Sequence, residues 1–265
     1  MKKLFMVLAA TVICGACVFT SCKKQDDLKL EEKIIGKWIL AESNGKPTLT
    51  NNKYVITFAS PTKGYLSASL GAHTEFSTFW GKRQEVDVAI TGNKVKNTIV
   101  INEHLTVIDD MTVTSITDSD TWGDLKISWM VDGTEAKTVE ESIRTVKVTD
   151  DYSQAILGTW ECLEITGGET NNDDNARLEF LADGTYNFYR LNDAGVWTLV
   201  PRERNEYFVD GILLCTRWQA AGEVKSYEWW EISSVAENGM QWTALRQNPD
   251  GTTFQQGVKW VKVNE

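Results

Sequence analysis

The sequence predicts an all-β protein built from two tandem small antiparallel β-barrels that follow an export signal. Three observations lead to this prediction. The 265 residues include eleven Trp and only four Pro, and the chain is rich in the aromatic and β-branched residues that favour strands. An apolar pair followed by Gly, any residue and Trp occurs at residues 34–38 and again at 156–160. Residues 1–21 have the composition of a signal peptide.

Composition and charge exclude two classes of protein. Hydrophobic residues make up 42% of the chain, which is enough to build a core in each half and argues against disorder. The formal net charge is -10, and a surface this acidic repels the phosphate backbone of nucleic acids. We therefore expect no nucleic-acid partner.

The N-terminal segment has the features of an export signal. Lys2 and Lys3 precede an apolar run, residues 4–18, that is too short for a comfortable membrane span. Small residues, Thr20 and Ser21, come directly before Cys22. This junction resembles the lipobox of bacterial lipoproteins. The resemblance implies cleavage after residue 21 and acylation of Cys22 by fatty acids such as palmitate. Cys17 is an alternative acceptor, and a plain secretory signal is the alternative interpretation.

Residues 22–33 are expected to form a lipid-anchored tether. Two acyl chains on one residue anchor a protein firmly, so the expected membrane contact is the lipid at Cys22. The charged stretch 23–27 resembles the segment that directs some Gram-negative lipoproteins to the cell surface, and a simple solvated tether is the alternative. The expected location is the outer membrane, on its periplasmic face or at the cell surface.

The first predicted domain covers residues 34–149. Alternating apolar and polar residues, bounded by turn signals, predict a series of short strands. Asn44-Gly45, Gly92-Asn93 and Asp132-Gly133 are the turn signals. The expected strands are 36–41, 53–58, 64–70, 76–80, 86–90, 99–101, 105–108, 111–114, 125–129 and 143–148.

A linker at residues 150–154 leads to the second predicted domain, residues 155–265. Its hairpin signals are clearer, with an Asp-Gly pair at Asp183, Asp210 and Asp250. The expected strands begin at Trp160 and continue at 177–181, 185–189, 195–199, 205–209, 212–215, 226–235, 240–245 and 254–260. Strands at this spacing are typical of antiparallel barrels and sandwiches.

The second half resembles the lipocalin-like domains of exported bacterial lipoproteins. The likeness rests on Gly-x-Trp at Trp160, on the Phe-x-x-Asp-Gly-x-Tyr hairpin from Phe180 to Tyr186, and on the turn around Gly211. It implies two tandem lipocalin-like barrels of about eight strands, in which Trp38 and Trp160 close one end of each barrel. It also implies a cationic residue over each Trp. Arg144 is the candidate for Trp38, and Arg246 or Lys259 is the candidate for Trp160.

Seven of the eleven Trp lie in the second half, where a ligand site is most expected. Period-two alternation places a set of aromatic residues on one inner face, namely Tyr186, Phe188, Trp197, Trp230 and Trp242. They either fill a packed core or line a pocket for a small apolar molecule or a glycan. Trp229 must face away from Trp230, so it is exposed or covered by the neighbouring domain and is a further candidate for binding.

Cys162 and Cys215 are the two cysteines beyond the export segment. An exported compartment permits a disulfide, and both residues lie on separate strands of one domain. A Cys162–Cys215 disulfide and two free buried thiols are the two alternatives.

The sequence offers little for catalysis. His73 and His104 are the only histidines, and no motif of a hydrolase, a metalloprotease or a phosphate loop is present. Asp109 and Asp110 are adjacent, so on a strand they point in opposite directions. Acidic loops such as residues 171–175 lack the spacing of a calcium loop. We expect no enzyme, no catalytic residue, no metal and no cofactor.

Two functions remain. The first is a lipid-anchored, non-catalytic binding protein for a small apolar ligand or a glycan. The second is a structural or interaction subunit with filled barrel cores, whose partner is another protein of the cell envelope. A cavity lined by Trp in the second half favours the first hypothesis, and filled cores favour the second. A polar cleft with a histidine beside a carboxylate would instead support the hypothesis of an enzyme.

Overall fold

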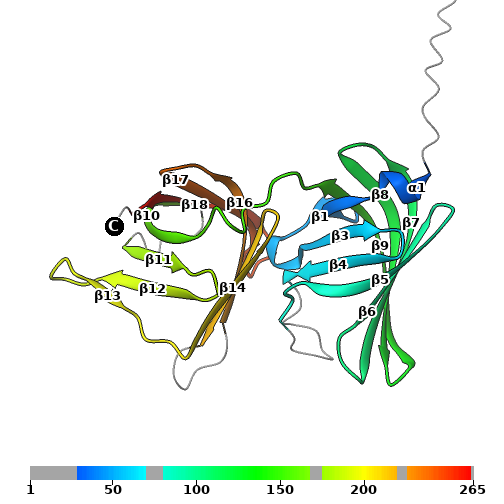
Figure 1. Ribbon diagram of the computed structural model, residues 1–265, viewed down its shortest axis with the longest axis horizontal. Helices are drawn as coiled ribbons and strands as arrows, with labels where there is room; N and C mark the ends of the chain where they lie inside the picture. The colour runs from blue at the N-terminus through cyan, green and yellow to red at the C-terminus, as the bar shows by residue number, and fades with distance from the viewer. Residues whose placement is uncertain (1–28, 70–79, 168–174, 220–225, 264–265) are drawn as a thin grey trace, which may run out of the picture.

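The computed structural model describes residues 29–69, 80–167, 175–219 and 226–263. The signal peptide, Cys22 and most of the predicted tether lie outside the described residues, as do His73 and the loop at 171–174. The described chain forms two nine-stranded antiparallel sheets that lie side by side (Figure 1). The all-β class is confirmed. In the described chain, helix is confined to α1 (Leu30–Lys33) and the 3-10 turn η1 (Thr50–Asn52).

The first sheet closes into a barrel of eight strands. β1 pairs with β3 on one side and with β9 on the other, and the strands between them pair in chain order. The short β2 extends the edge beside β1. The strands are β1 (Gly36–Ser43), β2 (Lys46–Pro47), β3 (Tyr54–Ser60), β4 (Lys63–Ala68), β5 (Gln84–Thr91), β6 (Lys94–Val100), β7 (Leu105–Ile116), β8 (Asp120–Val131) and β9 (Thr134–Lys147).

The second sheet is a half-barrel, which differs from the closed ring of the first. Its order is β13-β12-β11-β10-β18-β17-β16-β15-β14, so β13 and β14 are its two edges. Within the described residues, a single isolated bridge, Thr185 to Glu206, connects the two sides. The strands are β10 (Gly158–Thr166), β11 (Ala176–Phe180), β12 (Tyr186–Leu191), β13 (Trp197–Leu199), β14 (Arg204–Asp210), β15 (Leu213–Gln219), β16 (Ser226–Val235), β17 (Gly239–Gln247) and β18 (Thr253–Lys262).

The short strands β11 to β13 explain the open seam. β13 has three residues and β11 has five, so this side of the sheet offers few backbone groups for closing the ring. β7, β8 and β9 of the first sheet have 12, 12 and 14 residues. Long strands can curve around and complete a closed ladder, whereas short ones leave an edge.

The first strands of the two sheets, β1 and β10, have the same local structure. Trp38 pairs with Lys147 across β1 and β9, and Trp160 pairs with Lys262 across β10 and β18. Both ladders shift register just after this point, between residues 40 and 42 and between residues 162 and 164. The repeat read from the sequence is therefore a structural repeat.

Side chains that alternate along the strands form an apolar core in the interior of each sheet. The first interior contains Trp38, Phe58 and Val95, and Leu30 of α1 packs against it. Residues 30–33 of the predicted tether thus belong to the folded part of the chain. The second interior contains Trp160, Phe180, Trp242 and their neighbours.

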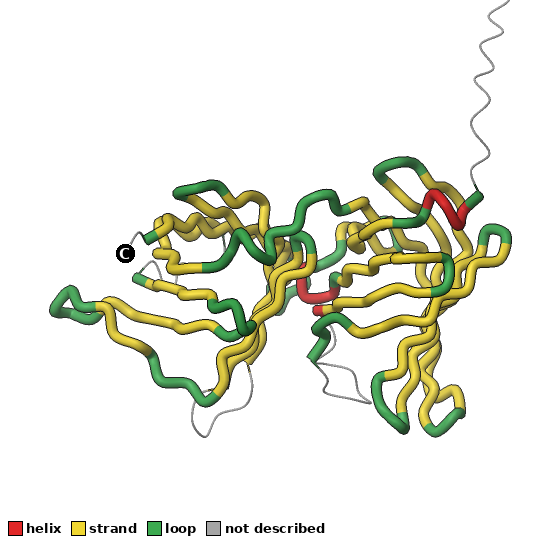
Figure 2. The backbone as a smooth tube through the Cα atoms, in the orientation of Figure 1, coloured by secondary structure: helices red, strands yellow, loops and turns green. Residues whose placement is uncertain are grey.

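A third apolar cluster joins the two sheets. Its buried members are Ile39 and Val55 from the first sheet and Phe208, Leu213 and Cys215 from the second. Figure 2 shows η1 at this junction, where the backbone N–H of Leu245 donates to Thr50 Oγ1 over 2.9 Å.

Ion pairs reinforce the junction. Lys37 Nζ lies 2.6 Å from Asp210 Oδ1, and Ser67 Oγ donates to the other oxygen of that carboxylate over 2.6 Å. Lys53 pairs with Glu231 at 3.1 Å. Apolar packing and paired charges together hold the two sheets in one arrangement.

Candidate functional site

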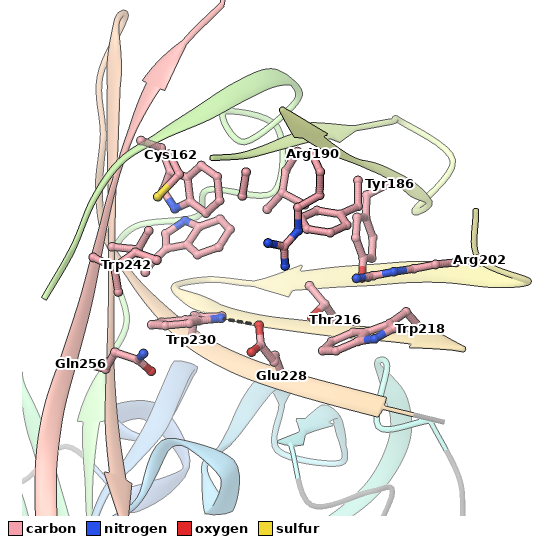
Figure 3. A pocket seen from close by; sticks show the side chains of 16 residues that line it. Cys162, Tyr186, Arg190, Arg202, Thr216, Trp218, Glu228, Trp230, Trp242 and Gln256 are labelled. Carbon is pink, nitrogen blue, oxygen red and sulfur yellow. Dashed lines mark hydrogen bonds between the residues drawn. The ribbon is translucent and has the colours of Figure 1, made fainter. Parts of the chain in front are cut away.

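The half-barrel encloses a cavity of about 300 Å³ (Figure 3). This volume is at the lower end of the range for small-molecule sites. The interior of the first barrel leaves about 20 Å³, close to the space of one water molecule. An interior able to hold a ligand is therefore found in the second sheet and not in the first.

Three indole rings form one wall of the cavity. Trp230 on β16, Trp242 on β17 and Trp260 on β18 are each at most 7% exposed. The ring centroids of Trp230 and Trp242 are 5.8 Å apart, and those of Trp242 and Trp260 are 4.7 Å apart. The wall follows from sequence alternation, because Trp242 shares its strand face with Met240 and Ala244, which are also buried.

The hydrogen-bonding groups of this wall differ from one another. Trp230 Nε1 donates to Glu228 over 3.4 Å, as the dashed line in Figure 3 marks. Trp242 Nε1 and Trp260 Nε1 are buried, and neither has an acceptor within the described chain. A buried indole N–H normally finds a partner, so these two donors are exceptions within the wall, and neighbouring protein atoms cover both of them.

The opposite wall is aromatic and cationic. Tyr186, Phe188 and Arg190 alternate along β12, and all three line the cavity. The guanidinium carbon of Arg202 lies 4.4 Å from the ring centroid of Phe188 and 4.9 Å from that of Trp218. Arg202 Nη1 also donates to the hydroxyl of Tyr186 over 3.4 Å.

Burial governs the titration of these groups. It lowers the pKa of Arg202 and raises the pKa of Tyr186. The direction is that expected when a charged form loses its water. At neutral pH the Tyr186 phenol is protonated, and Arg202 remains a cation because its pKa starts far above neutrality. The cavity wall therefore presents positive charge and hydrogen-bond donors.

The interior of the first barrel contains a partly buried acidic side chain. Asp109 on β7 faces inward among core residues, and its partner across the ladder is Asn97. Burial, followed by the nearby charge of Glu141, raises the pKa of Asp109 to about 7. Asp110 points outward and lines a shallow polar surface, so the two carboxylates point apart as expected.

The predicted ligand residues divide into three groups. Tyr186, Phe188, Trp230 and Trp242 line the cavity. Trp229 packs at the junction between the sheets, where its ring stacks with Tyr227 at 6.3 Å. Trp197 lies on the edge strand β13 under the guanidinium of Arg177, 4.2 Å from its centroid. The structure therefore does not bring Trp197 and Trp229 to the same site as the other four.

The alternative of free thiols holds for the cysteines. Cys162 and Cys215 are both buried and unbonded. Cys162 lines the cavity, whereas Cys215 belongs to the cluster between the sheets, so the two sulfur atoms face opposite sides of the second sheet. The suggested disulfide is absent for this reason.

The barrel-closing Trp residues are placed as the resemblance implied, but their cationic partners differ. Trp38 and Trp160 are at most 1% exposed, and each indole donates over 2.7 Å to the carbonyl of the residue four positions earlier. Lys147 and Lys262, from the last strand of each sheet, lie over the rings.

The three predicted cations are engaged elsewhere. Arg144 lies over Trp122 and Arg246 lies over Trp230. Lys259 pairs with Glu164 at 2.6 Å. The assignment of these residues to Trp38 and Trp160 was therefore wrong, because the cross-strand neighbour of each Trp is a Lys at the end of the last strand.

Sequence reasoning also missed part of the cavity. Trp260 and Val258 alternate on β18 in the same way as the predicted residues, so the period-two argument was sufficient to find Trp260. Arg202 lies in the connection before β14, where no periodicity applies. Its role depends on how that connection returns over Phe188 and Trp218.

His104 occupies an exposed turn. Its Nδ1 lies 2.7 Å from Asp132, and both side chains are about 70% exposed. The contact joins neighbouring turns of the first barrel and is not in a cleft. Separately, none of the helices in the described ranges is long and apolar enough to cross a membrane.

Comparisons with known proteins give distant similarities to solved structures. No protein-family model matches the chain, and no curated protein matches it. A solved structure of a double mutant of the vaccine antigen transferrin binding protein B from Haemophilus parasuis is similar at 13% identity, with a TM-score of 0.22. The similarity covers 88% of this chain and 45% of that chain, so this chain spans less than half the length of that protein. The architecture described above rests on strand pairing within this chain and not on this similarity.

Proposed function

We propose that this protein is a lipid-anchored envelope lipoprotein whose second domain binds a small, largely apolar molecule without catalysing a reaction. The observation that carries the proposal is the difference between the two interiors. The second contains a cavity of about 300 Å³ with aromatic walls, and the first is filled. A glycan is the less favoured ligand, because the rings surround a cavity and do not form an open platform for sugars.

The first barrel has a supporting role in this proposal. It covers the outer faces of β14 and β15, where it packs against Phe208, Leu213 and Cys215. β15 also carries Thr216 and Trp218 to the cavity side. A strand held on one face by a packed junction positions the residues on its other face, which suits a preformed binding site.

Thermal unfolding of the soluble chain, beginning after Cys22, tests the proposal. The two domains stay together in this experiment, because the junction would expose apolar surface if it were split. Fatty acids, sterols, haem and oligosaccharides are added separately. A ligand at 100 times its dissociation constant stabilises the folded state by about 2.7 kcal/mol, which raises the melting temperature by a few degrees.

A shift with one class of compound supports the binding function, and it must disappear when Trp242→Ala alters the cavity wall. The same substitution at Trp129 on the first barrel serves as the control. No shift with any class would instead favour the interaction subunit, whose partner is another envelope protein. Membrane anchoring is tested separately by labelling with palmitate, which we expect in the native precursor and not in Cys22→Ala.

A further inference from the structure

Two buried donors without a partner lie within the indole wall of the cavity in the second domain. Trp242 is 3% exposed and Trp260 is 7% exposed, and the Nε1 atom of each lacks an acceptor. Neighbouring protein atoms cover both N–H groups, so a molecule in the cavity meets the faces and edges of these rings and not their donors. The cationic donors in the lining are those of Arg190 and Arg202.

The charge of the cavity wall points to an anionic ligand. The chain as a whole carries a net charge of -10. Arg190 and Arg202 nevertheless line the cavity, and Glu228 is the acidic residue of the lining. The Arg190 guanidinium extends into the cavity between the Trp242 side and the Arg202 side (Figure 3). A positive site in an acidic protein favours an anion over a cation of the same shape.

Size and shape restrict the body of that anion. The cavity is small, and indole and phenyl rings form both of its long walls. Flat rings pack well against other flat rings, either offset-stacked or edge to face. A bulky or strongly hydrated molecule would lose its water without gaining matching contacts.

We infer that the ligand of this cavity is a small planar aromatic carboxylate. Its ring lies between the indole wall and Phe188, and its carboxylate accepts hydrogen bonds from the cavity's donors. This inference rests on the proposed function and specifies the chemistry of the same site. No covalent step is involved.

Four probes of similar shape distinguish how the charge, the hydrogen-bond acceptor and the apolar ring of a ligand each contribute to its affinity. They are 2-naphthoate, its neutral amide 2-naphthamide, the cation 2-naphthylmethylamine, and 2-methylnaphthalene, which has no acceptor. Binding is measured by isothermal titration calorimetry on the soluble two-domain chain. We expect the carboxylate to bind at least tenfold more tightly than the amide, the amide to bind more tightly than methylnaphthalene, and the amine to bind most weakly.

Two variants assign these differences to residues. Arg202→Gln should weaken the carboxylate at least tenfold and leave the amide within about threefold. Trp260→Phe reduces the ring area of the wall, so it should weaken the carboxylate, the amide and methylnaphthalene by similar factors. Arg204→Gln and Trp197→Phe are the matched controls, since neither residue lines the cavity.

Each outcome bears on one of the two claims. If the amide or methylnaphthalene binds as tightly as the carboxylate, the carboxylate inference is overturned and the binding function stands. If the control variants lose as much affinity as the cavity variants, the inference is also overturned. If no probe binds and the earlier panel also gives no shift, the binding function itself fails. Unfolding curves for Trp260→Phe show whether it is folded, and the four probes on the native chain test the inference in either case.

Discussion

Lys262 lies over the indole of Trp160, with its Nζ 5.1 Å from the ring centroid. The two residues are direct partners across β10 and β18, and Lys147 meets Trp38 in the same way at 5.3 Å. In each half, a Trp is thus enclosed by the core, by a carbonyl that accepts its N–H, and by the lysine of the last strand. This arrangement ties the first and last strands of each sheet together.

Removal of the Trp160 ring should therefore be severely destabilising. We expect Trp160→Phe to lower the free energy of unfolding by about 2–4 kcal/mol, because it leaves a cavity and deprives the Ile156 carbonyl of its donor. Urea denaturation provides the measurement. Trp122→Phe, at a ring that is 36% exposed, should cost less than about 1 kcal/mol. Equal losses at the two positions would contradict the closing role of Trp160.

The pH dependence of stability should carry the signature of Asp109. Its pKa is raised to about 7 in the folded state, against an ordinary value of 3.8 in the unfolded chain. Between these values the folded state binds more protons, so the stability contribution is fully present below about pH 4 and is lost as pH rises to about 7. The loss should be on the order of 2 kcal/mol, allowing for partial screening by solvent.

Asp109→Asn removes this titration while keeping the shape of the side chain. Stability between pH 4 and pH 7 should then depend less on pH than in the native chain, as measured by urea denaturation at a series of pH values. Asp110→Asn, on the outer face of the same strand, is the control and should leave the profile unchanged. An unchanged profile in Asp109→Asn would show that the raised pKa belongs to another group.

The junction between the sheets depends on a glycine. Gly211 has φ of +64°, and a Cβ there would lie 2.6 Å from Cγ1 of Val148. We expect Gly211→Ala to cost about 3 kcal/mol, combining backbone strain with a clash across the junction. Gly251 has φ of +87° and open space around it, so Gly251→Ala should cost about 1 kcal/mol. Thermal unfolding of both variants gives the cost of the clash as the difference between their losses of stability. Similar losses would mean that the residues at the junction shift to make room for the added methyl group.

The ion pair across the junction should behave unlike a surface pair. Asp210 is 6% exposed at its side chain and holds Lys37 at 2.6 Å. Lys37→Met should destabilise by about 2–4 kcal/mol, because it leaves a buried carboxylate with fewer partners. The Lys63–Glu85 pair is about 60% exposed on both sides, so Lys63→Met should leave stability close to that of the native chain. Denaturant titrations at low and high salt distinguish the two.

Free thiols give a chemical check on the second domain. Cys162 and Cys215 should both react with an alkylating reagent after unfolding without reductant, adding two mass increments. In the folded chain Cys215 should react very slowly, since burial raises the pKa of its thiol and no solvent path reaches it. A non-reduced chain that accepts no reagent on unfolding would show a disulfide and contradict this structure.

The sequence was sufficient for the features that depend on local pattern. The Asp183-Gly184 turn places Phe180 opposite Tyr186, and alternation along β12 and β17 places Tyr186, Phe188 and Trp242 on the inner face. Features that depend on whether a sheet closes into a ring could not be predicted from local sequence pattern. Whether β13 meets β14 depends on strand length and on the path of residues 200–203, which carry Arg202 into the site.

Trp197 illustrates the limit most clearly. Its partner across the ladder is Leu191, which faces away from the cavity because Arg190 faces into it. Trp197 therefore lies on the outer face, where its ring packs against Arg177. The rule that adjacent residues on a strand face opposite sides predicted that Trp229 and Trp230 lie on different faces. The packing of its outer face against the first barrel required the tertiary structure.

The seam between β12 and β14 has a kinetic consequence. Tyr207 is the main fastening, since its backbone N–H donates to Gly184 and its hydroxyl donates to Leu181, each over 2.8 Å. Separating the two sides breaks these two contacts, the first of which belongs to the Thr185–Glu206 bridge, whereas opening the first barrel breaks a complete ladder. Amide hydrogens of β12 and β13 should therefore exchange with solvent faster than those of β10 and β18, and the same opening gives a guest molecule a route in and out.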